Sequence, residues 1–279
     1  MKKLFAVAAI ITCSASVYAQ QDKKEERREA RKDRIEALRR QEEEGVLVYN
    51  KQTVWGIQLR TTGYGAFVEL GKMQNREVTN IMQIEFTETK HPKEYKAQRT
   101  DGYFFSNTPF VYGKQNYFYN LRFGLGQSRR IGDKGNKNGV SVQGVYLGGL
   151  SLGLLRPYYV EVIGDPNNAS TTKKIRYGNG NTDDDLLFLN PDVIVGGTGL
   201  GKGWGEIKFK PGLHAKTGIR FDYGRFNEVV SSLEVGLAGE VYAQKIAILA
   251  DKSYDGSPLA KNRQFFFNAY VAIEFGKRK

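Results

Sequence analysis

Acidic and basic side chains recur at every second position in several segments whose intervening positions are apolar. In 219–222, for example, Arg220 and Asp222 alternate with an isoleucine and a phenylalanine. Such alternation is the pattern of a β-strand with two unlike faces. Charges of both signs on one enclosed face can pair, which is the condition for burying them. The sequence therefore predicts an interior ion-pair network of nine residues: Arg60, Glu85, Arg122, Lys216, Arg220, Asp222, Glu234, Glu240 and Glu274.

The residue types that usually carry catalysis are sparse. His91 and His214 are the two histidines, and neither lies in a cluster with metal-ligand spacing. His91 precedes a proline, which favours a turn. His214 shares its alternation with Lys216 and Arg220, which favours a polar interior position. No Ser-His or Asp-His arrangement can be assembled. We therefore expect no enzyme, no cofactor and no metal.

Two further stretches resemble ligand sites in composition only. Asp183–Asp185 provides consecutive carboxylates, whereas a calcium loop needs six to eight oxygens at fixed spacing. Gly196–Gly203 is rich in glycine but fails the strict phosphate-loop pattern, and no strand–loop–helix unit surrounds it. Both are predicted to be ordinary loop segments.

The last strand-like segment, Phe265–Phe275, indicates what the apolar faces contact. Its odd-numbered positions are all apolar and largely aromatic, while its even-numbered positions include Asn268 and Glu274. A lipid-facing strand of a membrane barrel has this alternation, with aromatic residues at its ends.

The N-terminus predicts export. A basic head, Met1–Lys3, precedes the apolar run 4–12, which is too short to span a bilayer, and Val17–Ala19 provides a cleavage site. We expect residues 1–19 to be removed, which leaves a chain without cysteine. A lipoprotein-type cut before Cys13 is the alternative, although Thr12 fits that motif poorly.

Composition narrows the class of protein. The formal charge is +12, glycine numbers 32, phenylalanine and tyrosine number 16 each, and mean hydropathy is −0.49. A helical membrane protein is excluded, since no mature segment holds 18 consecutive apolar residues. Export argues against nucleic acid as a partner. Anionic outer-membrane lipid and lipopolysaccharide are the expected partners of a basic exported chain.

Residues 20–45 form a separate segment. Between Asp22 and Glu44 lie nine basic and nine acidic residues, several of them spaced four apart with opposite sign. Such pairs favour a helix, but no apolar seam accompanies them. The segment is predicted to be a solvated helix or disordered arm, or alternatively a periplasmic arm that docks a partner protein.

Eight strand candidates occupy residues 46–279: Val54–Arg60, Tyr64–Gly71, Thr79–Lys90, Asn116–Ser128, Gly139–Ile163, Leu213–Tyr223, Val229–Gln244 and Gln264–Gly276. Long connections at 91–115, 164–212 and 245–263 alternate with short ones. Short turns on one side and long loops on the other are typical of outer-membrane barrels. If the first two candidates were one strand, the barrel would have seven strands, and the long loops would lie on the periplasmic side. The fold class predicted is all-β, an eight-stranded antiparallel transmembrane β-barrel with a charged N-terminal helical arm.

Four aromatic residues in the loop 91–115 have two interpretations: Tyr103, Phe104, Phe105 and Phe110. If exposed, they would form an interaction patch. If the loop folds over the barrel mouth, they would be buried.

These features together resemble the small outer-membrane β-barrel proteins of Gram-negative bacteria, of which the transmembrane domain of outer membrane protein A is a familiar member. The resemblance covers about Val54–Gly276 and is one of architecture. The basic tail Lys277–Lys279 departs from it, because members of this group usually end on an aromatic residue. The charged arm resembles exported proteins of the Bacteroidota, where small barrels often serve as accessory subunits of secretion or barrel-assembly machines.

Three functions are compatible with such a chain. The first is a non-enzymatic structural or accessory barrel of a cell-envelope complex, with its interior filled by side chains. The second is a small pore or transporter for ions or polar solutes. The third, weaker, is a lipid-modifying barrel enzyme.

Overall fold

The computed structural model describes residues 29, 31–33, 36, 49–98, 108–134, 139–165, 168–199, 201–224 and 229–279. The predicted signal peptide, Cys13 and most of the arm lie outside these residues. The described residues of the arm are helical and exposed. None of the helices in the described ranges has the length and apolar character needed to cross a membrane.

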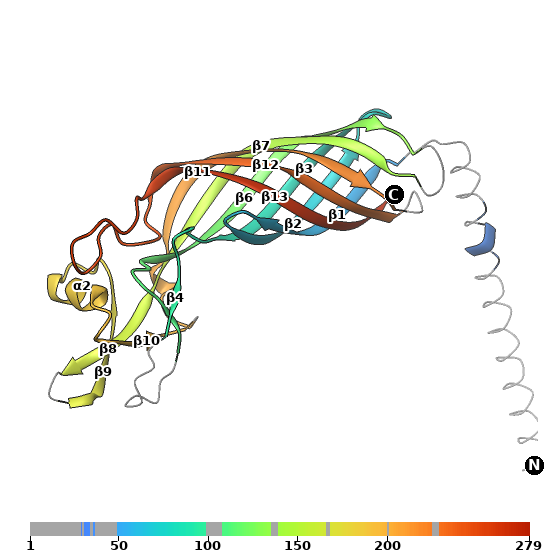
Figure 1. Ribbon diagram of the computed structural model, residues 1–279. Helices are drawn as coiled ribbons and strands as arrows, with labels where there is room; N and C mark the ends of the chain where they lie inside the picture. The colour runs from blue at the N-terminus through green and yellow to red at the C-terminus, as the bar shows by residue number, and fades with distance from the viewer. Residues whose placement is uncertain are drawn as a thin grey trace, which may run out of the picture.

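A closed antiparallel barrel of eight strands dominates the structure (Figure 1). Each strand hydrogen-bonds to its neighbours in sequence, and the first strand pairs with the last, which closes the cylinder. This arrangement confirms the predicted fold class and strand number. The strands are β1 (Lys51–Arg60), β2 (Gly63–Met73), β3 (Val78–Thr89), β6 (Asn116–Gly132), β7 (Ser141–Pro157), β11 (Lys208–Asp222), β12 (Val229–Ile246) and β13 (Arg263–Arg278).

The outer wall of the barrel is apolar. Trp55 and Phe275 pack together on adjacent strands with ring centroids 5.3 Å apart, and Phe265 and Phe267 are exposed toward the other end of β13. The ten residue steps from Phe265 to Phe275 correspond to about 33 Å of strand. At a tilt of about 40° this covers about 25 Å, the height of the apolar band of a membrane barrel. A closed barrel with such a wall leaves no edge unpaired in lipid, so we treat the strands as membrane-spanning.

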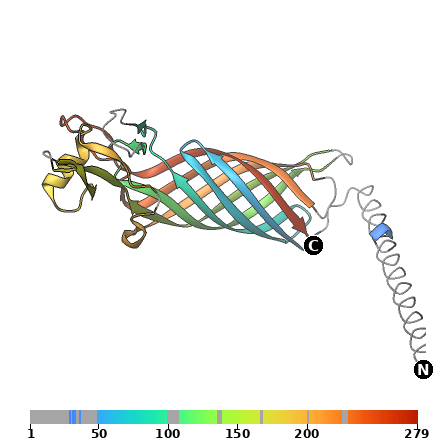
Figure 2. The ribbon, with the colours of Figure 1, turned by 90° about the horizontal axis from the view of Figure 1, so that it is seen from below.

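The two ends of the barrel differ (Figure 2). The terminal end carries the start of β1, the end of β13 and the short connections 74–77, 133–140 and 223–228. The cap end carries the connections 90–115, 158–207 and 247–262 and the two-residue turn between β1 and β2. Short turns and both ends of the barrel chain therefore share one side, as predicted from the strand count.

The described parts of the three long connections fold together into a cap over one end of the barrel. It contains β8 (Tyr159–Asp165), β9 (Asn168–Arg176) and β10 (Ile194–Gly197) in one sheet, and β4 (Lys96–Ala97) with β5 (Phe110–Val111) in another. It also contains the helix α2 (Thr182–Leu189) and the 3₁₀ turn η1 (Trp204–Glu206). Residues from all three connections form its apolar core: Phe110, Tyr112, Tyr158, Val160, Val162, Ile175, Phe188, Leu189, Ile194 and Ala250.

Helix α2 begins where local sequence chemistry favours it. The side chain of Asn181 accepts a hydrogen bond from the backbone N–H of Asp183, which caps the helix. Three aspartates occupy the first turn, where they interact favourably with the positive end of the helix dipole. The acidic run 183–185, predicted to be plain loop, is therefore part of a helix start.

Two strand boundaries were predicted wrongly. The sequence predicts one strand region over 139–163, but β7 ends at Pro157, and Tyr159–Asp165 is a separate cap strand. Proline fixes its own φ and lacks a donor, which suits a strand end. The last strand is predicted to end at Gly276, yet β13 continues to Arg278, which pairs with Gln52 of β1. The first two strands are longer than predicted, at 10 and 11 residues.

Candidate functional site: the filled lumen

The barrel interior, here called the lumen, contains an inner ion cluster centred on Arg220. Its guanidinium donates to both oxygens of Glu69, at 2.9 and 2.7 Å, and to Glu234, at 2.9 and 2.8 Å. The carboxylate of Glu274 lies 2.8 Å from Nε of Arg220. Lys216 adds a second cation, 3.2 Å from Glu234. All five side chains are buried, so each charge depends on its partners rather than on water.

An outer ion cluster lies nearer the cap. Arg122 donates to Glu85 at 2.5 Å and lies 3.3 Å from Glu240, which also accepts from Arg60 at 2.7 Å. The amide of Gln58 donates to the same oxygen of Glu85 that Arg122 contacts. Two arginines therefore bind two carboxylates in a chain of contacts that connects β1, β3, β6 and β12.

A third group of charges closes the terminal end. Arg278 donates to Asp222 at 2.5 Å, and Lys134 lies 3.7 Å from the same carboxylate. The guanidinium of Arg278 also lies over the ring of Tyr49, 4.8 Å from its centroid. The three groups together contain as many named cationic side chains as carboxylates. Because their formal charges balance, no mobile counterion is needed to neutralise them.

Apolar and aromatic layers separate the ion clusters and cover them. Phe67, Ala238, Tyr270 and Ala272 form one layer, and the Lys216 ammonium lies 4.8 Å from the ring of Phe67 and 4.4 Å from that of Tyr270. At the cap end a second layer closes the lumen: Phe118, Leu155, Tyr242, Ile246, Ile248 and Phe266. Because these layers alternate with bound charges, the lumen is packed along its length with side chains, which is the capacity of an eight-stranded barrel.

All nine residues that the alternation predicted as the interior network are buried inside the barrel. The structure divides them between the outer cluster, the inner cluster and the pair at the terminal end. Sequence reasoning missed Glu69 and Arg278, although both follow the inward phase of their strands. It also missed two tyrosines that complete the clusters: Tyr270 donates to Glu234 at 2.6 Å, and Tyr242 donates to Glu240 at 2.9 Å.

The remaining predicted residues take other positions. His214 is buried in the barrel, and its Nδ1 lies 3.1 Å from the hydroxyl of Ser151.

Phe110 is only 4% exposed in the cap core, so it offers no surface patch. Its burial follows from the packing of the three connections over the barrel mouth. The other members of the predicted patch, Tyr103, Phe104 and Phe105, lie outside the described residues. Within the described ranges, no three potential metal ligands lie together.

One buried ion pair joins the two ends of the connection between β3 and β6. Lys114, just before β6, donates to Glu94 at 2.7 Å, and the backbone N–H of His91 donates to the other oxygen of this carboxylate at 2.9 Å. Burial lowers the pKa of the Lys114 ammonium below its ordinary value, and Glu94 opposes the shift. Burial also lowers the pKa of His91, with a smaller lowering from nearby Arg263. Both side chains of the Lys114–Glu94 pair are therefore largely shielded from water.

No protein-family model matches the sequence, and no curated protein matches it. Among solved structures, Ail, the attachment invasion locus protein of Yersinia pestis, crystallised with the heparin analogue sucrose octasulfate, is 9% identical with a TM-score of 0.37. The match covers 83% of this chain and 100% of Ail. The N-terminal β-barrel domain of Pseudomonas aeruginosa OprF is 8% identical, with a TM-score of 0.34. The match covers 82% of this chain and 98% of that domain.

Neisserial surface protein A is also 8% identical, with a TM-score of 0.33, and the match covers 81% of this chain and 92% of that protein. The likeness to these small outer-membrane barrels concerns the fold alone. The closed eight-stranded barrel of this chain is the architecture that its sequence resembled, and the Bacteroidota affiliation stays a prediction.

Proposed function

We propose that the protein is a non-enzymatic outer-membrane β-barrel that serves as a structural or accessory subunit of a cell-envelope complex. The observation that carries this proposal is the lumen itself, which is crossed by ion pairs such as Arg220 with Glu69. A barrel filled in this way works through its outer wall, its cap and its terminal end. The wall anchors it in lipid, and the other two surfaces are available to partners.

The sidedness of the barrel supports this assignment. In outer-membrane barrels the short turns face the periplasm and the long loops face outward. The cap would then lie outside the cell, and the segment 20–45 would enter the periplasm directly beneath β1. Its dense charges of both signs could pair with a charged partner surface, and ordering on contact would permit reversible docking.

An arm-deletion pull-down tests the accessory role. The tag is placed in the exposed cap hairpin near Gly256, and the complex is solubilised gently with and without residues 20–45. The matched control keeps the composition of residues 22–44 but scrambles their order. We expect one defined envelope protein to be recovered with the native arm and lost with both altered arms. Recovery of the same proteins from all three would remove the docking role.

Conductance in planar bilayers tests the second candidate, a pore. Ions could traverse the lumen only if the inner and outer clusters both rearranged, and breaking buried ion pairs is costly. We expect the purified protein to remain silent under conditions in which a porin reference forms channels. Stable, reproducible channels from the native protein would overturn the proposal in favour of transport.

A further inference from the structure

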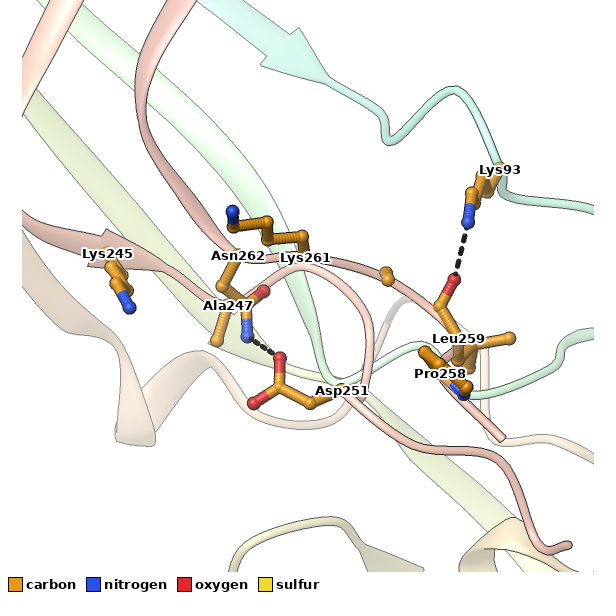
Figure 3. A pocket seen from close by; sticks show the side chains of 9 residues that line it. Lys93, Lys245, Ala247, Asp251, Pro258, Leu259, Lys261 and Asn262 are labelled. Atoms are coloured by element: carbon orange, nitrogen blue, oxygen red, sulfur yellow. Dashed lines mark hydrogen bonds between the residues drawn. The ribbon is translucent and has the colours of Figure 1, made fainter. Parts of the chain in front are cut away.

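A basic pocket lies where β12 ends and β13 begins, and Figure 3 shows side chains that line it, among them Lys93, Lys245 and Lys261. It consists of two adjoining cavities of about 540 and 480 Å³ that share Lys93 and Lys261, and we call them together the outer-rim pocket. Lys245 and Asp251 line the first cavity, and Arg263 lines the second.

The charges around the outer-rim pocket are mostly cationic and available. In the described part of the chain, Lys245, Lys261 and Arg263 have no ion-pair partner. Lys93 donates to the backbone carbonyl of Leu259 at 3.0 Å, which fixes its ammonium at the pocket edge. The one acid of the lining, Asp251, accepts a hydrogen bond from Asn262 at 2.6 Å. The pocket therefore suits an anion with several charges.

The floor of the pocket has the opposite character. Ile246 and Ile248 are buried beneath it, and Phe266 closes it toward the lumen. Phe265 and Phe267 line the same cavity and lie 60% exposed on the outer wall. Phe265 and Phe267 thus belong both to the lining of the pocket and to the outer wall of the barrel.

The strand register places this boundary at the level of lipid head groups. Val241 of β12 pairs with Phe265 of β13, both outward, at the upper edge of the apolar band. The next outward cations are Lys245 on β12 and Arg263 on β13. Arg263 is two residues beyond Phe265, which corresponds to about 5 Å of height along a tilted strand, and Lys245 is four residues beyond Val241, which corresponds to about 10 Å. Cations at these heights face the polar layer of the membrane rather than its acyl interior.

We propose that the outer-rim pocket binds the phosphorylated head group of an outer-leaflet glycolipid, with an acyl chain lying along Phe265 and Phe267. Lysine ammonium groups bind phosphate as point charges, and several separated cations match a sugar that carries more than one phosphate. A soluble polyanion would use the cations but leave the phenylalanines unused. The proposal rests on the proposed function, because the cap end must face the outer leaflet.

The test measures binding of bisphosphorylated lipid A, and of the same lipid A after dephosphorylation, to the full-length protein in detergent by native mass spectrometry. The pocket variant is Lys261→Gln with Arg263→Gln. The control is Lys202→Gln with Lys208→Gln, which removes two exposed charges at the same end of the barrel, outside the pocket. We expect the pocket variant to bind phosphorylated lipid A roughly thirtyfold more weakly and the control to bind like the native protein.

Three results would overturn the proposal: equal binding of the two lipid A forms, equal losses in the two variants, or tighter binding of a heparin-type sulfated oligosaccharide than of lipid A with the same pocket dependence. The last result would assign the pocket to a soluble glycan. Heat-modifiable gel mobility and flotation with liposomes are measured on the same samples. If these persist while lipid binding fails, only the pocket assignment is wrong. If flotation of the native protein fails, the membrane placement is wrong as well.

Discussion

Arg220 and Glu69 form a bidentate ion pair across the full width of the barrel, with N–O distances of 2.9 and 2.7 Å. Their strands, β11 and β2, are four places apart in either direction around the ring of eight and therefore face each other. The two residues are separated by 151 positions in the chain. A single guanidinium thus links opposite walls and holds the carboxylates of Glu234 and Glu274 as well.

Replacing this guanidinium should destabilise the barrel strongly. In Arg220→Met, three buried carboxylates would retain only Lys216 as a nearby cation, and breaking a buried pair in this way costs about 3–5 kcal/mol. Urea unfolding in detergent, followed by heat-modifiable gel mobility, measures the change. Arg129→Met is the control, because that arginine is exposed. Unfolding of both variants at the same urea concentration would contradict the central role of Arg220.

The cap core should be separable from the barrel. Phe188 of α2 is 1% exposed among residues from all three connections. Phe188→Ala should destabilise the cap by about 3–5 kcal/mol through lost burial and a residual cavity. Limited proteolysis should then cut within 158–207 while the barrel keeps its gel mobility. Leu186→Ala, on the exposed side of the same helix, should be cut no faster than the native protein. Loss of barrel mobility in Phe188→Ala would show that the two parts fold as one.

Acid should loosen the start of α2. Hydrogen bonds from Lys173, at 2.7 Å, and from Asn179, at 2.9 Å, lower the pKa of Asp184. The ionised carboxylate is therefore favoured in the native state, and its stabilisation is fully present above the ordinary aspartate value near 3.9. It is lost as pH falls through the lowered native value.

Hydrogen–deuterium exchange of residues 178–190, corrected for intrinsic rates, measures this effect at pH 6 and pH 3. We expect protection to fall at pH 3 in the native protein. In Asp184→Asn, which cannot ionise, protection should be lower at pH 6 and should change less with pH. The same pH dependence in both proteins would assign the effect to other groups.

Trp55 should report the membrane placement of the wall. It lies on the outer face of β1 against Phe275, at the end of the apolar band nearest the termini. The sequence has two tryptophans, so Trp204→Phe leaves Trp55 alone. In liposomes its emission should be strongly quenched by lipids with brominated acyl chains. The reciprocal variant, Trp55→Phe, keeps Trp204 in the cap and should be quenched less. Equal quenching of the two would contradict the proposed position of the band.

Local sequence determined the strands and their faces, because successive side chains of a strand point to opposite sides. That rule alone placed Arg60, Glu240 and the other predicted charges on one face, and it would also have placed Glu69 there. The rule extends to Arg278, whose inward phase continues from Glu274, two residues beyond the predicted end of the strand at Gly276. The residues that turn inward are thus a property of the chain itself.

The partners of those residues were decided only by closure of the barrel. Periodicity assigns a face but not a position around the ring, so it could not indicate that Arg220 meets Glu69 across the lumen. The cap was still less predictable, because its core combines residues of three different connections, among them Phe110, Tyr158 and Ala250. Likewise, the outer-rim pocket exists because the end of β12 and the start of β13 lie beside the segment that follows β3. Contacts between residues far apart in the chain depend on which segments the closed cylinder brings together, and that information is not local.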